Sequence, residues 1–171
     1  IILENGGFCP TASLIFETEA ISNVPEWFDR APFGDYFLQI FGALKGGALY
    51  IDRPMSIYRR NTPGSWSGTM QDIAMREKRF KKMLTTLDEM DRYFDRQFHS
   101  EIRKVESDWY LRLALSYLHN EHFEKFDAAI RESYRLSELK SKKLLLSFYM
   151  RKFPVLLRSI GKLNKYLPFK G

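Results

Sequence analysis

The stretch Pro32–Gly68, PFGDYFLQIFGALKGGALYIDRPMSIYRRNTPGSWSG, decides the fold expected for this chain. Its first half has apolar side chains at the spacing of one helical face, at Phe37, Ile40, Phe41 and Leu44. This pattern predicts an amphipathic helix that begins close to Asp35. Gly46-Gly47 should end it, because glycine readily adopts the left-handed conformation of a helix cap.

Short apolar runs on either side of this helix are strand candidates, namely Ala12–Phe16, Ala48–Asp52 and Met55–Arg59. From Gln71 onward the pattern becomes helical, with helices predicted at about 71–95, 102–118 and 123–136. The sequence therefore predicts an α+β protein that is mostly α-helical. Its expected parts are a strand-bearing region over 1–66, a helical extension over 67–137 and a basic amphipathic tail over 138–171.

The charge of the chain is unevenly distributed. The 171 residues have a net charge of +6, yet residues 140–171 contain nine Lys or Arg and no Asp or Glu. The other 18 basic and 21 acidic residues give residues 1–139 a charge of −3. The single cysteine, Cys9, excludes an internal disulfide and favours a reducing compartment. We therefore predict a cytoplasmic location, at the inner face of the membrane if the tail binds lipid.

Apolar and basic residues alternate in the tail, and two interpretations of this pattern stay open. A basic amphipathic segment can lie in an anionic membrane surface. Alternatively, its apolar side packs on the helical extension and its charges are solvated. No run approaches the roughly 18 apolar residues of a spanning helix. No established nucleic-acid-binding motif is present, so no nucleic acid partner is predicted.

The order of features in the first third of the chain resembles a known enzyme family. An acidic residue at a helix start, a glycine break, two short strands and an Arg-rich loop resemble the acceptor-side half of family 2 glycosyltransferases. Asn5–Ser13, NGGFCPTAS, resembles the segment that follows the metal-binding loop in that family. The resemblance covers about residues 3–68. It implies that the strands belong to a partial GT-A sheet, with the nucleotide-binding half and its Asp-x-Asp metal motif upstream of Ile1.

The resemblance also implies roles for individual residues. Gly34-Asp35 matches the acidic motif, with Asp35 as the catalytic base, although Asp is also a favoured residue for closing a helix end. Arg59 and Arg60 are candidates for binding the diphosphate, since guanidinium groups pair well with phosphate oxygens. Further candidates for substrate binding are Ser65 and Trp66, in a loop that closes over the nucleotide-sugar, and Thr11 and Ser13 in the acceptor pocket. Trp66 could stack on a sugar face or, equally, anchor the start of the helical extension. Asn61 stands where many relatives have a histidine, so no metal ligand is assigned to this loop.

These assignments imply an inverting transferase that moves a sugar from a nucleotide-sugar to a glycan or lipid-linked acceptor, as in cell-surface polysaccharide biosynthesis. Mg²⁺ or Mn²⁺ is expected in the full-length enzyme and no metal in this chain, which we expect to be inactive alone. The alternative is a non-catalytic helical module that binds a partner or a membrane. The two hypotheses differ in whether function depends on Asp35.

Overall fold

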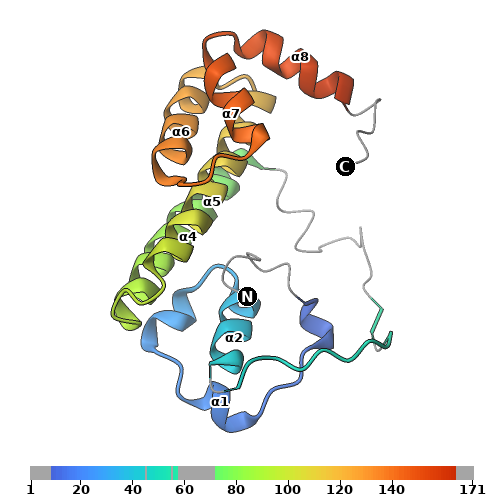
Figure 1. Ribbon diagram of the computed structural model, residues 1–171, viewed down its shortest axis with the longest axis vertical. Coiled ribbons are helices and arrows are strands. Elements are labelled where there is room, and N and C mark those ends of the chain that lie inside the picture. The colour runs from blue at the N-terminus through green and yellow to red at the C-terminus, as the bar shows by residue number, and fades with distance from the viewer. Residues whose placement is uncertain (1–8, 45, 55, 58–71, 165–171) are drawn as a thin grey trace. The chain divides into compact units, whose positions relative to one another are not determined.

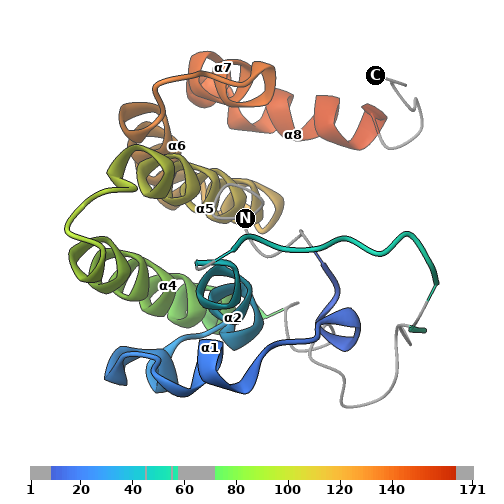
Figure 2. The same cartoon turned by 60° about the horizontal axis from the view of Figure 1, so that its bottom comes forward.

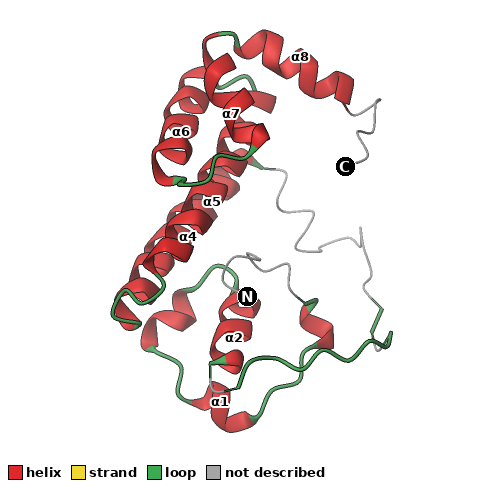
Figure 3. Cartoon of the chain, viewed as in Figure 1, coloured by secondary structure: helices red, strands yellow, loops and turns green. Residues whose placement is uncertain are grey.

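The computed structural model describes residues 9–44, 46–54, 56–57 and 72–164, and every regular element in these ranges is a helix (Figures 1 and 3). The α-helices are α1 (Thr18–Ser22), α2 (Gly34–Ala43), α4 (Ile73–Tyr93), α5 (His99–His119), α6 (Phe123–Leu136), α7 (Lys142–Tyr149) and α8 (Pro154–Asn164). The same ranges contain three 3-10 turns: η2 (Thr11–Ser13), η3 (Glu26–Arg30) and η4 (Met150–Lys152). The chain divides into two compact units, residues 1–105 and 106–171.

The prediction of an α+β fold with a partial GT-A sheet is wrong, because no strand occurs among the described residues (Figure 3). The run Ala12–Phe16 begins inside η2, where the backbone N–H groups of Ser13 and Leu14 bond the carbonyls of Pro10 and Thr11. Residues 48–52 and 56–57 are irregular, and the rest of Met55–Arg59 lies outside the described residues. A strand needs a neighbouring strand to pair its backbone groups, and short apolar runs do not show by themselves whether one exists.

The predicted helices are confirmed, and α2 lies at the centre of the first unit. Its residues Phe37, Ile40 and Phe41 are buried, as their spacing indicated. Gly47 has a φ of 79° and its N–H bonds the Ala43 carbonyl at 2.8 Å, so a glycine in the left-handed region follows the helix end.

An aromatic cluster joins η3, α2 and α4 in the first unit. The Trp27 ring lies 5.4 Å from Phe37, 5.8 Å from Phe41 and 6.4 Å from Tyr93, measured between ring centroids. Such tilted and edge-to-face pairs stabilise beyond the area that they bury. At the surface, Arg30 Nη2 pairs with Glu89 Oε1 at 3.0 Å and adds a second link between η3 and α4.

A buried carboxylate fixes the turn between α4 and α5. Asp91 lies in the last turn of α4 with its side chain 8% exposed, and its Oδ2 accepts a hydrogen bond from His99 Nδ1 at 2.6 Å. The turn passes through Asp95 and Arg96, whose φ angles are 49° and 60°. The Arg96 N–H donates to the Asp91 carbonyl at 2.8 Å, so Asp91 is bonded by backbone and side chain together.

The second unit packs α6 between α5 and α7. Ser133 is fully buried and exchanges hydrogen bonds with Ser107 of α5: each hydroxyl donates to the other residue's carbonyl, at 2.7 and 2.8 Å. On the other side, the Tyr134 ring stacks on Phe148 of α7 with centroids 3.8 Å apart. Figure 2 shows α7 and α8 as separate helices joined at a bend.

Because Ser133 is buried against Ser107, we expect position 133 to tolerate only a small side chain. Ser133→Leu should lower the free energy of unfolding by about 1–3 kcal/mol, because a larger side chain overpacks the contact between α5 and α6. Ala128→Leu adds similar bulk to the exposed side of α6 and should stay within about 0.5 kcal/mol of wild type. Urea unfolding measures both, and an equal effect of the two variants would contradict the close packing.

Removing the side chain of His99 should destabilise the folded chain, because the carboxylate of Asp91 is buried. We expect His99→Ala to lower the free energy of unfolding by about 1–3 kcal/mol, since the buried carboxylate of Asp91 loses the hydrogen bond from His99. Arg92→Ala, which breaks the exposed Asp88–Arg92 pair, should cost at most about 1 kcal/mol. Thermal or urea unfolding measures both variants. A larger loss of stability in Arg92→Ala than in His99→Ala would contradict the importance of the His99–Asp91 pair.

Candidate functional site

Asp35 lies in the first turn of α2, where unpaired backbone N–H groups and the helix dipole favour a negative charge. Its Oδ2 accepts a hydrogen bond from Thr11 Oγ1 at 2.7 Å, and its Oδ1 accepts one from the Tyr36 N–H at 3.0 Å. The residue at the N-cap position is Phe33, which makes no side-chain cap bond. Asp35 therefore shares the Tyr36 N–H with the Phe33 carbonyl without being the N-cap residue of the helix, and its second oxygen accepts the hydroxyl of Thr11.

Gln39, one turn further along α2, ties the segment before η2 to the helix. Its Oε1 accepts from the Cys9 N–H at 3.2 Å, while its Nε2 donates to the carbonyls of Cys9 at 3.3 Å and Asp35 at 3.2 Å. The side chain is buried, so a fully paired amide costs little and orients the backbone at Cys9. Thr11 follows two residues later, which explains how its hydroxyl reaches Asp35.

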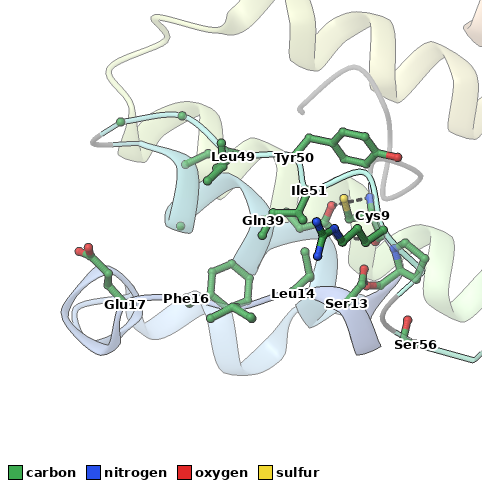
Figure 4. Close-up of a pocket in the computed structure, with 18 of the residues that line it drawn as sticks. Cys9, Ser13, Leu14, Phe16, Glu17, Gln39, Leu49, Tyr50, Ile51 and Ser56 are labelled. Atoms are coloured by element: carbon green, nitrogen blue, oxygen red, sulfur yellow. Dashed lines mark hydrogen bonds between the residues drawn. The ribbon is translucent and has the colours of Figure 1, made fainter.

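A pocket of about 970 Å³ opens beside this arrangement, within the first unit (Figure 4). Its walls are formed by Cys9, Pro10 and Ser13–Glu17, by the helix positions Gln39, Gly42 and Ala43, and by Gly46–Ile51, Arg53, Pro54 and Ser56. Figure 4 shows Gln39 between Leu14 and Phe16 on one side and Leu49 and Ile51 on the other. The pocket is thus lined by apolar side chains together with the polar groups of Ser13, Ser56 and Arg53. Such a lining suits a ligand that has both apolar and polar surface.

Glycine at position 42 shapes the pocket wall. A Cβ atom there would lie 2.5 Å from Cδ1 and 2.6 Å from Cε1 of Phe16, closer than real contacts allow. The Phe16 ring therefore rests directly on the α2 backbone and forms part of the pocket wall. Any larger residue at position 42 would push the ring away from the helix.

The structure brings together some of the residues that the sequence predicted for the site. Gly34 is the first residue of α2 and directly precedes Asp35; Thr11 bonds Asp35, and Ser13 lines the pocket. Asp35 itself does not line the pocket. The predicted substrate-binding residues Arg59, Arg60, Ser65 and Trp66 lie outside the described residues.

Sequence reasoning missed Gln39 and Arg53. Gln39 had a detectable signal, because it is a polar residue four positions after Asp35 and between the buried residues Phe37 and Ile40. A polar side chain in an apolar stripe needs a partner, and here the partner is the Cys9 backbone. Arg53, an exposed cation at the pocket, had no such signal.

Among residues 9–44, 46–54, 56–57 and 72–164, no three His, Cys, Asp or Glu side chains are grouped so that they could bind a metal ion. The described residues thus do not fit the Mg²⁺ or Mn²⁺ site of the family, and no chemical step is assigned to a metal here. Comparisons with protein-family models, with curated proteins and with solved structures gave no match for this chain.

Tyr36, next to Asp35, is buried, and burial raises the pKa of its phenol above the usual value of 10.0. Above about pH 10 the unfolded chain releases this proton and the folded chain keeps it, so stability falls as the pH rises. In Tyr36→Phe, the free energy of unfolding should therefore decrease less steeply with pH, by up to about 1.4 kcal/mol per pH unit. Urea unfolding from about pH 9 to pH 12 measures it, and Tyr50→Phe, 71% exposed, is the control that should keep the wild-type slope.

Proposed function

We propose that this chain is the acceptor-side portion of an inverting glycosyltransferase, in which Asp35 is the base that activates an acceptor hydroxyl. The observation that carries the proposal is the Thr11–Asp35 hydrogen bond. Two segments that the family resemblance assigns to the acceptor side, 24 positions apart in sequence, meet at this carboxylate. Oδ2 already accepts an alcohol O–H at 2.7 Å, a distance that suits proton transfer from an acceptor hydroxyl.

In the proposed reaction, an acceptor hydroxyl takes the place of Thr11 Oγ1 at Oδ2. Its oxygen forms a bond to the anomeric carbon while its proton passes to Asp35. The bond between the anomeric carbon and the nucleoside diphosphate breaks, and the electron pair leaves with the diphosphate. Attack from the face opposite the leaving group inverts the configuration.

The remaining groups have supporting roles in this proposal. The Tyr36 N–H and the dipole of α2 stabilise the carboxylate before the proton arrives. The pocket receives the acceptor glycan or lipid-linked sugar, with Ser13 and Ser56 as hydroxyl partners and Leu14 and Leu49 against apolar faces of the ring. Arg59 and Arg60 compensate the charge of the diphosphate, and Ser65 and Trp66 contact the donor sugar.

A second candidate is a non-catalytic interaction module, and a separate observation favours it. Five apolar side chains on and between α7 and α8 are exposed, a feature that sugar transfer at Asp35 does not require. Loss of function on changing Asp35 distinguishes the two candidates.

The test replaces Asp35 by asparagine in the parent protein, which the proposal expects to carry a nucleotide-binding half with an Asp-x-Asp motif upstream of Ile1. Release of nucleoside diphosphate from a panel of nucleotide-sugars, with and without acceptor, should fall by about 10²- to 10⁴-fold. The variant should stay folded, because the amide oxygen still accepts the Tyr36 N–H and the amide NH2 group can donate to Thr11 Oγ1.

Asp29→Asn provides the matched control, since Asp29 is an exposed aspartate in the same unit and the charge change is identical. It should leave the release rate unchanged. Equal rates for wild type and Asp35→Asn would overturn the assignment of the base, and a parent gene without a nucleotide-binding half would overturn the transferase proposal.

A further inference from the structure

The segment formed by α7, η4 and α8 exposes five large apolar side chains. We call them the C-terminal apolar face: Leu146, Tyr149, Phe153, Val155 and Leu156, which are 44–66% exposed. The inner side of the same helices is also apolar, since Leu144 and Leu157 are buried within the second unit. The exposed set is therefore additional to the core and is not explained by packing within the described residues.

The charges around this face have one sign. Lys142, Lys143 and Lys152 are exposed and form no ion pair with any described residue. The two arginines of the region behave differently: Arg151 Nε lies 3.5 Å from Asp127 Oδ1, and Arg158 pairs with Glu121. The last acidic residue of the sequence is Glu138. The arginines are thus neutralised by the second unit, and the three lysines are left to compensate charges outside the chain.

We propose that the C-terminal apolar face binds the surface of an anionic lipid bilayer. Apolar side chains on short helices, flanked by lysines, match a membrane interface, where the side chains enter the acyl boundary and the ammonium groups meet lipid phosphates. Lysine suits this position because its long stem lies along apolar surface while its charge stays at the head groups. A protein partner would have to be both acidic and apolar over the same patch, and the uniform positive charge favours the bilayer.

The fold supports contact with a bilayer surface. No helix among the described residues has both the length and the apolar character that crossing a bilayer demands. Pro154 begins α8 directly after Phe153, the residue that follows η4. The segments α7 and α8 are therefore two separate short helices (Figures 1 and 2). Arg151 lies over the Phe148 ring at 4.2 Å, and that ring stacks on Tyr134, which fixes α7 to α6. The exposed side chains are therefore presented by an anchored helix pair.

The test is flotation of the chain with phosphatidylcholine vesicles that do or do not contain phosphatidylserine. Wild type should bind the mixed vesicles, and binding should weaken as salt rises from about 0.1 M to 1 M, which shortens the screening length. The triple variant Lys142→Gln, Lys143→Gln, Lys152→Gln should bind roughly 100-fold more weakly. Phe153→Ser combined with Leu156→Ser should weaken binding by about tenfold or more while leaving its salt dependence.

Two control variants match these changes elsewhere in the chain. Lys78→Gln, Lys81→Gln, Lys82→Gln removes three exposed charges from α4, and Leu44→Ser with Ile57→Ser removes two apolar side chains that are 48% and 94% exposed. Both should bind mixed vesicles like wild type. The proposal is overturned if wild type does not float with mixed vesicles, if phosphatidylcholine alone binds it equally, or if the controls weaken binding as much as the test variants.

Discussion

The first unit depends on the packing of Trp27 against two helices that are far apart in the sequence. Its ring contacts Phe37 and Phe41 of α2 and Tyr93 of α4, so a single side chain from a five-residue turn joins both helices. This packing fixes α2, and α2 in turn holds Asp35 and Gln39 one helical turn apart. The polar arrangement at the site is therefore a consequence of an apolar contact on the opposite side of the helix.

Two observations together give Asp35 more than a structural role in the proposal. The residue is not the N-cap of α2, so its carboxylate is not used up in closing the helix. One oxygen accepts a backbone N–H, which fixes the orientation of the group, and the other accepts the hydroxyl of Thr11. A base needs this combination, because one oxygen must stay in place while the other exchanges its hydroxyl partner.

The helices α2, α4, α5 and α6 could be predicted from the sequence, whereas the predicted strands are wrong within the described residues. The apolar face at Phe37, Ile40 and Phe41 defines a helix through local spacing, and the long charged segments after Gln71 do the same. The runs at Ala12–Phe16 and Ala48–Asp52 have no such local determinant, since a strand depends on a partner that the sequence does not identify. The prediction placed Asp35 on the correct helix turn, but its link to Cys9 through Gln39 depends on tertiary packing.

The proposal for Asp35 concerns the first unit, and the proposal for membrane binding concerns the charged and apolar residues of the second unit. In the second unit, Asp127 and Glu121 pair with the arginines near α7 and α8, whereas Lys142, Lys143 and Lys152 form no ion pair with a described residue. A fold that only needed solubility would gain nothing from placing Phe153 and Leu156 beside those lysines. Because Asp35 and the C-terminal apolar face belong to different units, each can be changed without altering the other. A lipid-linked acceptor is the one substrate class that would make both features serve the same reaction.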